Sequence, residues 1–401
     1  MGLLDALMGN ASEVDVAEVQ EELQPILGNA EMEYIEEFTN KRMFNNLHSQ
    51  LPPIHESSVA LLHADLCNPC DNYTWEVAES LYIERIEEEV VIGMFGDVQE
   101  SDLRHLERML DALRVVAPML KIRYSTDVNQ VTLPIHYAKC TEDFSEKFND
   151  CFRNTWGYFV RYSEPTHGWI WVDSSLTDVF KQFTLTHEIG HALGLGHPHD
   201  KNYSYGTFPG VTKGSGYDFG AHKLNGSPWT VMTYNEINKK GKYNPKSPAF
   251  NGFSTNIGAF DIAAIQYLYG ANKTKNKGNN IYKLNDKLNG FKCIWDTGGI
   301  DVIEASSASG SSTINLNNAT LEKEIGGGGF ISQINGKFKG YTIAYKTKNK
   351  VIKCIIENAI GSKFNDQIIG NDAKNKLNGG FGNDKLIGGS GNDKLIGGSG
   401  N

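Results

Sequence analysis

The chain has 401 residues, of which 40% are hydrophobic and 21% are charged, an ordinary balance for a protein that buries a core. That length favours two domains over one. The chain carries 38 basic and 48 acidic residues, a net charge of −10, and no basic stripe runs along it. These values argue against nucleic acid as a partner and make a divalent cation a reasonable one.

Nothing in the sequence predicts a membrane span, because no apolar run reaches the roughly 18 residues that a transmembrane helix needs. The N-terminus also lacks the positively charged start and long apolar segment of a secretory signal peptide. The six cysteines stand at positions 67, 70, 140, 151, 293 and 354. Disulfide bonds in an oxidising compartment would explain their even number and close pairs, and scattered thiols explain them equally well.

In chain order, residues 1–55 are acidic and favour helix, and we interpret them as an N-terminal extension or pro-region. Helical and strand patterns then mix over residues 56–272. Apolar residues at helical spacing predict a helix over 101–120 that begins at Ser101 as its N-cap. Further strands are predicted at 121–124, 131–137 and 168–173, and further helices at 180–194 and 260–269.

Residues 187–197 read HEIGHALGLGH and carry the strongest chemical signal in the chain. His187 and His191 are four residues apart, so both imidazoles lie on one helix face and can bind one ion. Glu188 falls beside that ion, where it can accept a proton from bound water. A left-handed turn at Gly194 would end the helix and let His197 supply a third nitrogen. Three protein ligands leave one coordination position open, which is typical of catalytic zinc.

Chance is a weak explanation of this motif. HExxH arises in roughly one chain in a hundred of this length, and requiring Gly194 and His197 lowers that by a factor on the order of several hundred. The alternative is a helix whose histidines are simply solvated. Because His199 and His222 lack such spacing, we assign both to ordinary surface or loop roles.

HExxHxxGxxH resembles the zinc motif of the metzincins, and within them the best match is the serralysin family of secreted bacterial proteases. The segment SPWTVMTY, with Met232 at 35 residues beyond His197, is similar to the methionine turn of that family. The resemblance implies that Met232 packs beneath the metal and that Tyr234 is an additional, displaceable zinc ligand. Core packing alone would also explain Met232.

The resemblance extends over roughly residues 180–401. Residues 260–272 are similar to the helix that closes the serralysin catalytic domain, and Asp296-Thr-Gly-Gly-Ile-Asp301 looks like the first calcium loop, with Asp296 and Asp301 as implied ligands. An edge strand around Trp169 and Trp171 is implied to bind substrate by β-addition, and core aromatics of a sheet are the alternative. The implied fold class is an α+β metzincin-type catalytic domain followed by an all-β parallel β-roll.

The tail repeats every nine residues from Gly361, approximating G-G-x-G-x-D-x-U-x, a pattern that winds a parallel β-roll. Leu386 and Leu395 are expected to fill its interior, and its stacked turns supply oxygens for calcium. Asp366 and Asp372 stand in less regular repeats and are predicted to bind more weakly, or only at the edge. A flexible linker is the alternative, but apolar residues recur in phase. The predicted calcium residues of the regular repeats are Gly379, Gly380, Gly382, Asp384, Gly388, Gly389, Gly391 and Asp393.

We therefore interpret residues 56–272 as a zinc metalloprotease domain and residues 273–401 as a calcium-binding β-roll that stops within a repeat. The predicted function is a secreted, monomeric, zinc-dependent endopeptidase that uses Zn²⁺ and Ca²⁺, with protein or peptide chains as substrates and Glu188 as general base. The resemblance implies export by a type I route, whose C-terminal signal is not among these residues. The alternative is a non-catalytic calcium-dependent binding or adhesion protein on a relic protease fold, and metal-dependent hydrolysis of a non-peptide bond ranks last.

Overall fold

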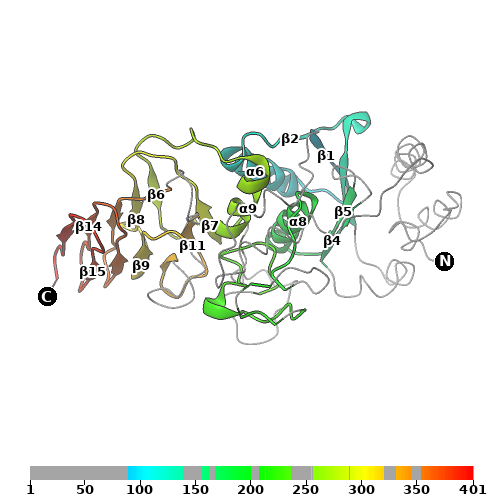
Figure 1. The fold of residues 1–401 in the computed structure, drawn as a ribbon. Coiled ribbons are helices and arrows are strands. Elements are labelled where there is room, and N and C mark those ends of the chain that lie inside the picture. The colour runs from blue at the N-terminus through cyan, green and yellow to red at the C-terminus, as the bar shows by residue number, and fades with distance from the viewer. Residues whose placement is uncertain are drawn as a thin grey trace, which may run out of the picture.

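The computed structural model describes residues 89–138, 156–161, 168–199, 207–235 apart from 209 and 213, 254, 256–288, 290–319, 331–344 and 354–400. The described elements form two parts side by side, one of helices and a mixed sheet, the other of strands alone (Figure 1). The predicted extension at 1–55 lies outside the described residues, as do the cysteines at 67, 70, 140 and 151.

The first part is built on a five-stranded sheet in the order β2-β1-β3-β5-β4. Four strands run parallel, and β4 pairs antiparallel with β5. The prediction of an edge strand at 168–173 is wrong, because that strand is β5 and lies between β3 and β4. Trp171 is 1% exposed, as expected of a core aromatic. The strands are β1 (Val90–Gly96), β2 (Ile122–Tyr124), β3 (Leu133–Ala138), β4 (Gly157–Arg161) and β5 (Gly168–Asp173).

Three α-helices accompany this sheet among the described residues: α6 (Glu100–Val116), α8 (Asp178–Ala192) and α9 (Ala259–Tyr269). Each overlaps a segment predicted as helix, although α6 ends at Val116, before the predicted end at 120, and α8 ends at Ala192, before 194. The N-cap of α6 is Gln99 and not Ser101 as predicted, because Asp102 accepts a hydrogen bond from the Gln99 backbone nitrogen at 2.9 Å. Short 3-10 turns lie at Val128–Gln130 and Ala221–Lys223.

Two further sheets make up the roll. From β12 onward, strands alternate between the two sheets and stack in parallel on the strand 18 residues away, such as Asn358 on Lys376. Before the repeats, β10 runs antiparallel to β9 and β11, so the roll is not parallel throughout. One sheet holds β6 (Ile281–Lys283), β8 (Val302–Glu304), β12 (Asn358–Ile360), β14 (Lys376–Asn378) and β16 (Lys394–Ile396); the other holds β7 (Phe291–Ile294), β9 (Ser312–Asn315), β10 (Ser332–Ile334), β11 (Gly340–Ile343), β13 (Gln367–Ile369) and β15 (Lys385–Ile387).

The middle residue of each repeat strand faces the interior of the roll. Ile368 and Leu377 are fully buried, and Leu386 is partly buried against the same core. Leu395, predicted to fill the interior, is 49% exposed in β16, the outermost described strand of its sheet.

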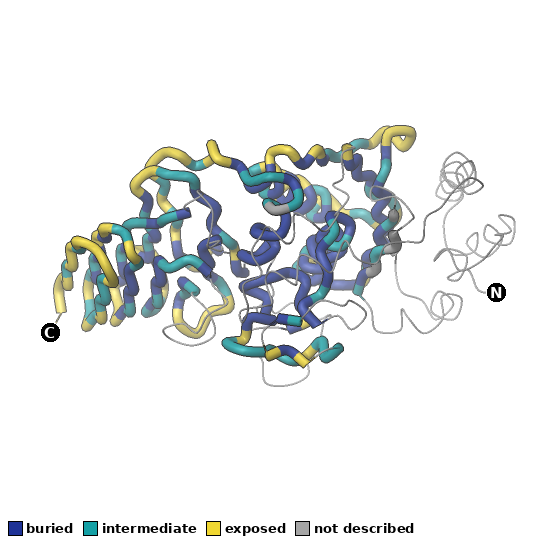
Figure 2. Tube along the Cα trace, in the orientation of Figure 1, coloured by how far each residue is buried: buried dark blue, intermediate teal, exposed yellow. Residues whose placement is uncertain are grey.

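The two parts share one continuous hydrophobic core. It runs from Leu110 of α6 through Trp229 and Phe260 to Ile294 and Ile314 of the roll, and Figure 2 shows buried chain passing from one part into the other. The indole of Trp295 also donates a hydrogen bond to the carbonyl of Asn272 at 3.2 Å. The roll is thus packed against the helical part through buried apolar side chains.

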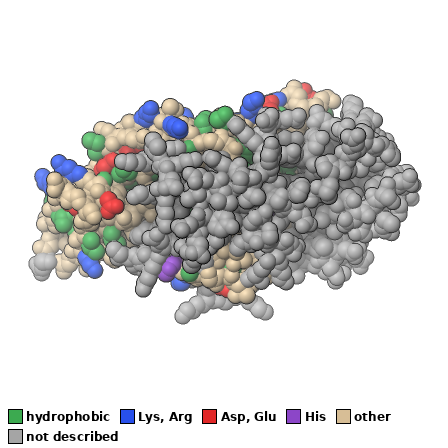
Figure 3. Space-filling view, in the orientation of Figure 1, with side chains coloured by type: hydrophobic (Ala, Val, Ile, Leu, Met, Phe, Trp, Pro, Cys, Tyr) green, Lys and Arg blue, Asp and Glu red, His purple; other side chains and the backbone are tan. Residues whose placement is uncertain are grey.

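The surface carries both charges. On the described part of the face in Figure 3, basic and acidic side chains are interspersed. Among the described helices, none is long and apolar enough to span a bilayer.

Candidate metal centres

Three histidine side chains converge at the end of α8. The Nε2 atoms of His187 and His191 are 3.1 Å apart, and that of His197 lies 3.2 Å from His187 and 3.1 Å from His191. The helix places the first two on one face, as predicted. It then ends in a turn at Gly194, whose φ of +99° brings the chain back toward His197.

Backbone carbonyls fix the tautomers of two of these rings. Nδ1 of His187 lies 2.7 Å from the carbonyl oxygen of Val231, and Nδ1 of His191 lies 2.7 Å from that of Leu195. A carbonyl can only accept, so each Nδ1 carries the proton and each neutral ring presents an unprotonated Nε2. The two Nε2 atoms therefore face one another across a contact that no proton bridges and that a cation would relieve.

The donor set fits zinc. Zinc–nitrogen bonds of about 2.0–2.1 Å in a tetrahedral site place ligand nitrogens about 3.3 Å apart. The observed separations of 3.1–3.2 Å are close to that value. Neutral imidazole is also a preferred ligand of zinc.

Glu188 follows the first histidine and is 6% exposed. Burial raises the pKa of its carboxyl group to about 8 in the metal-free protein. A nearby dication would favour the carboxylate form and oppose that shift. Strand β4 lies directly beside it, since a Cβ added at Gly157 would stand 3.1 Å from Glu188 Cγ.

Met232, predicted to lie under the site, packs against α8 at Gly190, between the positions of His187 and His191 in the chain. It is fully buried, and a Cβ placed on Gly190 would lie 2.5 Å from its sulfur. Glycine at position 190 of the zinc helix therefore makes room for the methionine. Without a side chain there, the two elements approach closely.

Tyr234 reaches the histidines from the following turn. Its hydroxyl oxygen lies 2.9 Å from His197 Nε2, although the residue as a whole is 41% exposed. His199, predicted to have a surface or loop role, lies in a turn, but the surface alternative is wrong. It is 7% exposed, and its ring stacks on His197 at 5.0 Å and contacts that of Tyr234 at 4.8 Å. His222 lies in a 3-10 turn and is partly exposed, in agreement with a loop role.

The predicted first calcium loop gathers carboxylates in a buried place. Asp296 and Asp301 are both fully buried, and the backbone nitrogen of Asp301 donates to Glu357 at 2.8 Å. Oδ2 of Asp301 has no hydrogen-bond partner among the described residues. Burial, with Asp296 and Glu357 nearby, raises the pKa of Asp301 to about 6. A calcium ion would relieve this repulsion and use the unsatisfied oxygen.

The regular repeats bring aspartates against backbone in the same way. Oδ1 of Asp384 accepts from the backbone nitrogen of Asp366 at 2.8 Å, while its Oδ2 is buried without a partner in the described structure. Oδ1 of Asp393 accepts from the Asn375 nitrogen at 2.9 Å. The predicted glycines at 380, 382, 389 and 391 all have φ between +92° and +110°, the turn conformation that the repeat needs.

The first repeats replace some of these features with amides and hydroxyls. Where the regular repeats have Gly389 and Asp393, the earlier turn on that edge has Asn371 and Asn375. The Asn375 amide donates to the carbonyl of Glu357 at 2.9 Å and to Asn371 Oδ1 at 3.0 Å. On the other edge, Asp366 accepts from the hydroxyls of Ser312 and Ser362, each at 2.9 Å. In these first repeats, hydrogen bonds within the protein thus satisfy the polar side chains. Asp372, also predicted to bind weakly, is exposed.

Comparison with known proteins gives two family matches. Residues 173–289 match the family described as Met-zincin, and residues 356–386 and 369–401 match the RTX calcium-binding nonapeptide repeat. The chain is a serralysin-like metzincin. Its metals are accordingly zinc and calcium.

The curated relatives agree over the same region. Serralysin B of Dickeya chrysanthemi is 34% identical over 203 residues, which are 47% of this chain and 36% of that protein. Metallopeptidase AprA of Pseudomonas marginalis is 35% identical over 201 residues, 46% of this chain and 36% of that protein. Serralysin of Photorhabdus luminescens is 36% identical over 200 residues, which are 46% of this chain and 35% of that protein. The matched region thus spans about a third of the length of these relatives.

A carboxylate of α9 supports the zinc site of this metzincin from behind. Asp261 accepts hydrogen bonds from the Thr230 hydroxyl at 2.6 Å and from the backbone nitrogen of Val231 at 2.7 Å. Val231 is the residue whose carbonyl holds His187. A chain of hydrogen bonds therefore leads from α9 through the methionine turn to a metal ligand. The sequence gives no signal for this chain of hydrogen bonds, because no motif fixes the spacing between Asp261 and the methionine turn.

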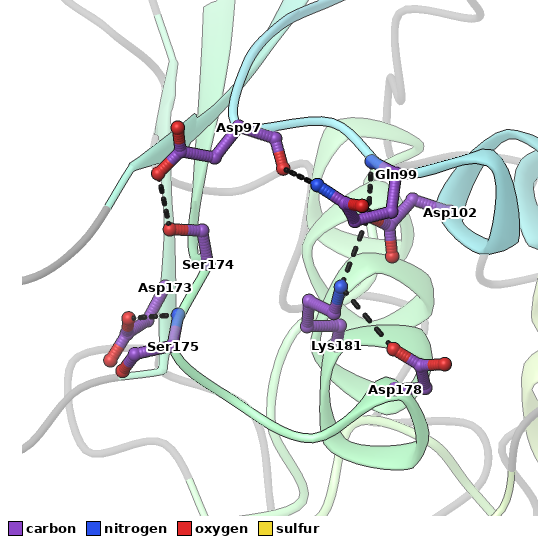
Figure 4. Close-up of polar contacts among 8 residues, drawn as sticks. All are labelled: Asp97, Gln99, Asp102, Asp173, Ser174, Ser175, Asp178 and Lys181. Atoms are coloured by element: carbon purple, nitrogen blue, oxygen red, sulfur yellow. Dashed lines mark hydrogen bonds and ion pairs between the residues drawn. The ribbon is translucent and has the colours of Figure 1, made fainter.

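A buried ion pair fixes the other end of the zinc helix (Figure 4). Lys181 of α8 is 3.1 Å from Asp102 of α6, and their side chains are 5% and 2% exposed. Lys181 also approaches Asp178 at 3.4 Å. The pair ties the two helices of the metzincin together. Alternation of apolar and charged residues in each helix gives no hint of it.

The cysteines inside the described structure, Cys293 and Cys354, are thiols and form no disulfide. For these two, the reading as scattered thiols holds. Cys354 is buried, and its sulfur accepts a hydrogen bond from the backbone nitrogen of Asp296 at 3.3 Å.

Proposed function

We propose that this chain is a zinc-dependent endopeptidase in which Glu188 is the general base. The observation that carries the proposal is the convergence of three Nε2 atoms within 3.2 Å, on a scaffold that fixes two of the tautomers. His187, His191 and His197 would hold the zinc ion. Membership of the metzincins supports the reaction class. The site is complete within one chain, so we propose that the protein acts as a monomer.

When bound, zinc supplies Lewis acidity and lowers the pKa of its water ligand toward neutrality. Glu188, the carboxylate that follows His187 in α8, would accept a proton from the attacking water and pass it to the leaving amine. The hydroxyl of Tyr234 lies 2.9 Å from His197 Nε2, where it would be a displaceable zinc ligand. Once displaced, it would donate a hydrogen bond to the oxygen of the scissile carbonyl.

Strand β4 is the best candidate for binding an extended substrate. It is the last strand in the described sheet, and it runs along α8 next to Glu188. A peptide that pairs with its outer edge would present its carbonyl groups to the metal side. This assigns to Gly157–Arg161 the role that the sequence had suggested for the strand at 168–173.

We also propose the division of the chain into a catalytic domain at 56–272 and a roll at 273–401, and a function outside the cell. Crowded, partly unsatisfied carboxylates in the roll suit binding in the range of 10⁻⁴–10⁻³ M calcium, about the level that extracellular modules use. Calcium titration of the folded roll tests this, and a midpoint near 10⁻⁷ M contradicts it. Export by a type I route stays a prediction.

The deciding experiment compares the wild type with Glu188→Gln against casein and a peptide library, in zinc and calcium. We expect cleavage by the wild type and a loss of about 10³-fold in kcat in the variant, with one zinc bound by each. Full zinc loading without cleavage by the wild type would favour the non-catalytic binding protein. Undiminished cleavage by Glu188→Gln would remove the general base from the proposal.

A further inference from the structure

Tyr234 sits in a slot that the metal-binding motif does not define. One wall is the ring of His199, which contacts the tyrosine ring at a centroid distance of 4.8 Å. The other is the backbone of Gly216: a Cβ added there would stand 2.7 Å from Tyr234 Cδ2 and 3.1 Å from His199 Nε2. Gly216 therefore touches both rings at once, and no side chain fits between them.

The loop that carries Gly216 is anchored on both sides of the slot. The backbone nitrogen of Gly214 donates to the carbonyl of His199 at 2.6 Å, and the side chain of Asn235 donates to the carbonyl of Gly216 at 3.2 Å. One anchor thus lies in His199 itself and the other in the residue that follows Tyr234. These two hydrogen bonds fix the position of Gly216 relative to Tyr234 and His199.

His199 also bears on the metal ligands. Its ring is stacked on that of His197 at 5.0 Å with an interplanar angle of 28°. The same residue therefore contacts both the His197 ring and Tyr234, and the ring of His187 lies 5.8 Å from that of Tyr234. Between these contacts, the tyrosine hydroxyl is brought to 2.9 Å from His197 Nε2.

We propose that His199 and Gly216 are positioning residues that hold Tyr234 at the open coordination position of the three-histidine site. The inference rests on the proposed function and adds to it the groups that set where the tyrosine stands. His199 acts through ring packing and Gly216 through the lack of a side chain. Neither residue touches the substrate or the metal in this scheme.

Substitution at Gly216 isolates the steric effect. The backbone of Gly216 does not adopt the left-handed conformation that disfavours other residues, so alanine adds a methyl group without backbone strain. That methyl group must displace Tyr234 or His199, because it would overlap both. Gly310 is a matched control, since a Cβ there meets its nearest atom at 3.8 Å, an ordinary contact.

The test replaces zinc with Cu²⁺, which binds imidazole sites, and records the tyrosinate-to-copper charge-transfer absorption of the full chain in calcium. Tyr234→Phe calibrates the loss of the band. We expect Gly216→Ala and His199→Ala to weaken it by on the order of threefold or more with one copper still bound, and His199→Phe and Gly310→Ala to keep it. In the zinc protein, Gly216→Ala should lower kcat about tenfold at unchanged KM.

A band of full strength in both Gly216→Ala and His199→Ala overturns the proposal. So does a wild type that binds copper without the band, because Tyr234 is then not at the metal. A wild type that binds neither zinc nor copper overturns the proposed function itself, which separates the two failures. Should Gly216→Ala lose metal altogether, His199→Ala against His199→Phe still decides whether the aromatic ring matters.

Discussion

The two metal regions of this molecule are built on opposite electrostatic plans. At the three-histidine site the proposed ligands are uncharged rings, and backbone carbonyls 2.7 Å away orient His187 and His191 before any ion arrives. In the roll, the proposed ligands include carboxylates that crowd together, and oxygens of Asp301 and Asp384 are buried without partners in the described structure. The first site is preorganised, whereas the second is repulsive until calcium binds.

This contrast teaches where each ion acts. Removal of zinc should abolish the chemistry but leave the fold around the histidines in place, because hydrogen bonds and the shared core hold it. Removal of calcium leaves carboxylates of like charge close together in the turns of the roll. We therefore expect the roll to lose stability without calcium. The contrast can be broken or sharpened by four experiments, given from the largest expected effect to the smallest.

Calcium removal should give the largest effect. Chelation should raise amide hydrogen exchange in residues 379–400 by about 100-fold for each site saturated at 100 times its Kd. Exchange in α8 should change far less, because its packing does not depend on calcium. Hydrogen–deuterium exchange with mass spectrometry measures both. A zinc-selective chelator in calcium buffer is the control, and melting of α8 on zinc removal alone would break the comparison.

Loss of the buried ion pair should destabilise the helical part. Lys181→Met leaves Asp102 buried and uncompensated, which should cost about 3–5 kcal/mol in the free energy of unfolding. The double variant Asp102→Leu/Lys181→Met should recover much of that loss. Arg104→Ala, which removes the exposed pair with Glu100, should cost less than about 1 kcal/mol. Equal costs for Lys181→Met and Arg104→Ala in denaturant titrations would contradict this account.

An amide in the first repeats can be exchanged for the carboxylate of the regular ones. Asn375→Asp removes the donors to Glu357 and Asn371 and should destabilise the calcium-free roll by about 1–3 kcal/mol. Calcium should restore it, because the new carboxylate lies on the same edge as Asp393. The reciprocal variant, Asp384→Asn, should lower the calcium dependence of its own level. Calorimetric calcium titration of both tests this, and an unchanged calcium response in Asn375→Asp argues against it.

Acid should weaken calcium binding at the first loop. The folded, calcium-free protein has the pKa of Asp301 raised to about 6, so it binds a proton more tightly than the unfolded chain does. Its stability contribution is therefore present at low pH and is lost as pH rises through about 6. Calcium must displace that proton, so its affinity should fall by up to about tenfold per pH unit below 6. Titrations at several pH values measure this, and Asp301→Asn should flatten the dependence.

The sequence predicted what depends on local spacing. The positions of His187, His191 and the turn at Gly194 follow from helix geometry, and a nine-residue period predicts the alternating strands of the roll. The helices α8 and α9 were found because their apolar residues form long, dense segments. Resemblance added Met232 and Tyr234, whose places in the turn the structure matches; their roles remain proposals.

What could not be predicted depends on contacts between distant segments. Strands β1 and β4 were missed, because only tertiary pairing distinguishes them from other short apolar stretches. The strand order then places β4 at the edge of the described sheet, where the strand at 168–173 was expected. His199 has no ligand spacing, so its burial became visible only once the loop around Gly216 was seen to cover it. Leu395 matches Leu377 in pattern and differs only by its place at the end of a sheet.

The hydrogen bonds from Asp261 through Val231 to His187 give the metal site a remote dependency. A carboxylate on the closing helix sets the position of a carbonyl, and that carbonyl sets which nitrogen of an imidazole is available to the ion. Metal affinity can therefore change among related proteins whose zinc motif is identical. Intact HEIGHALGLGH is no guarantee of a loaded enzyme when position 261 has been altered.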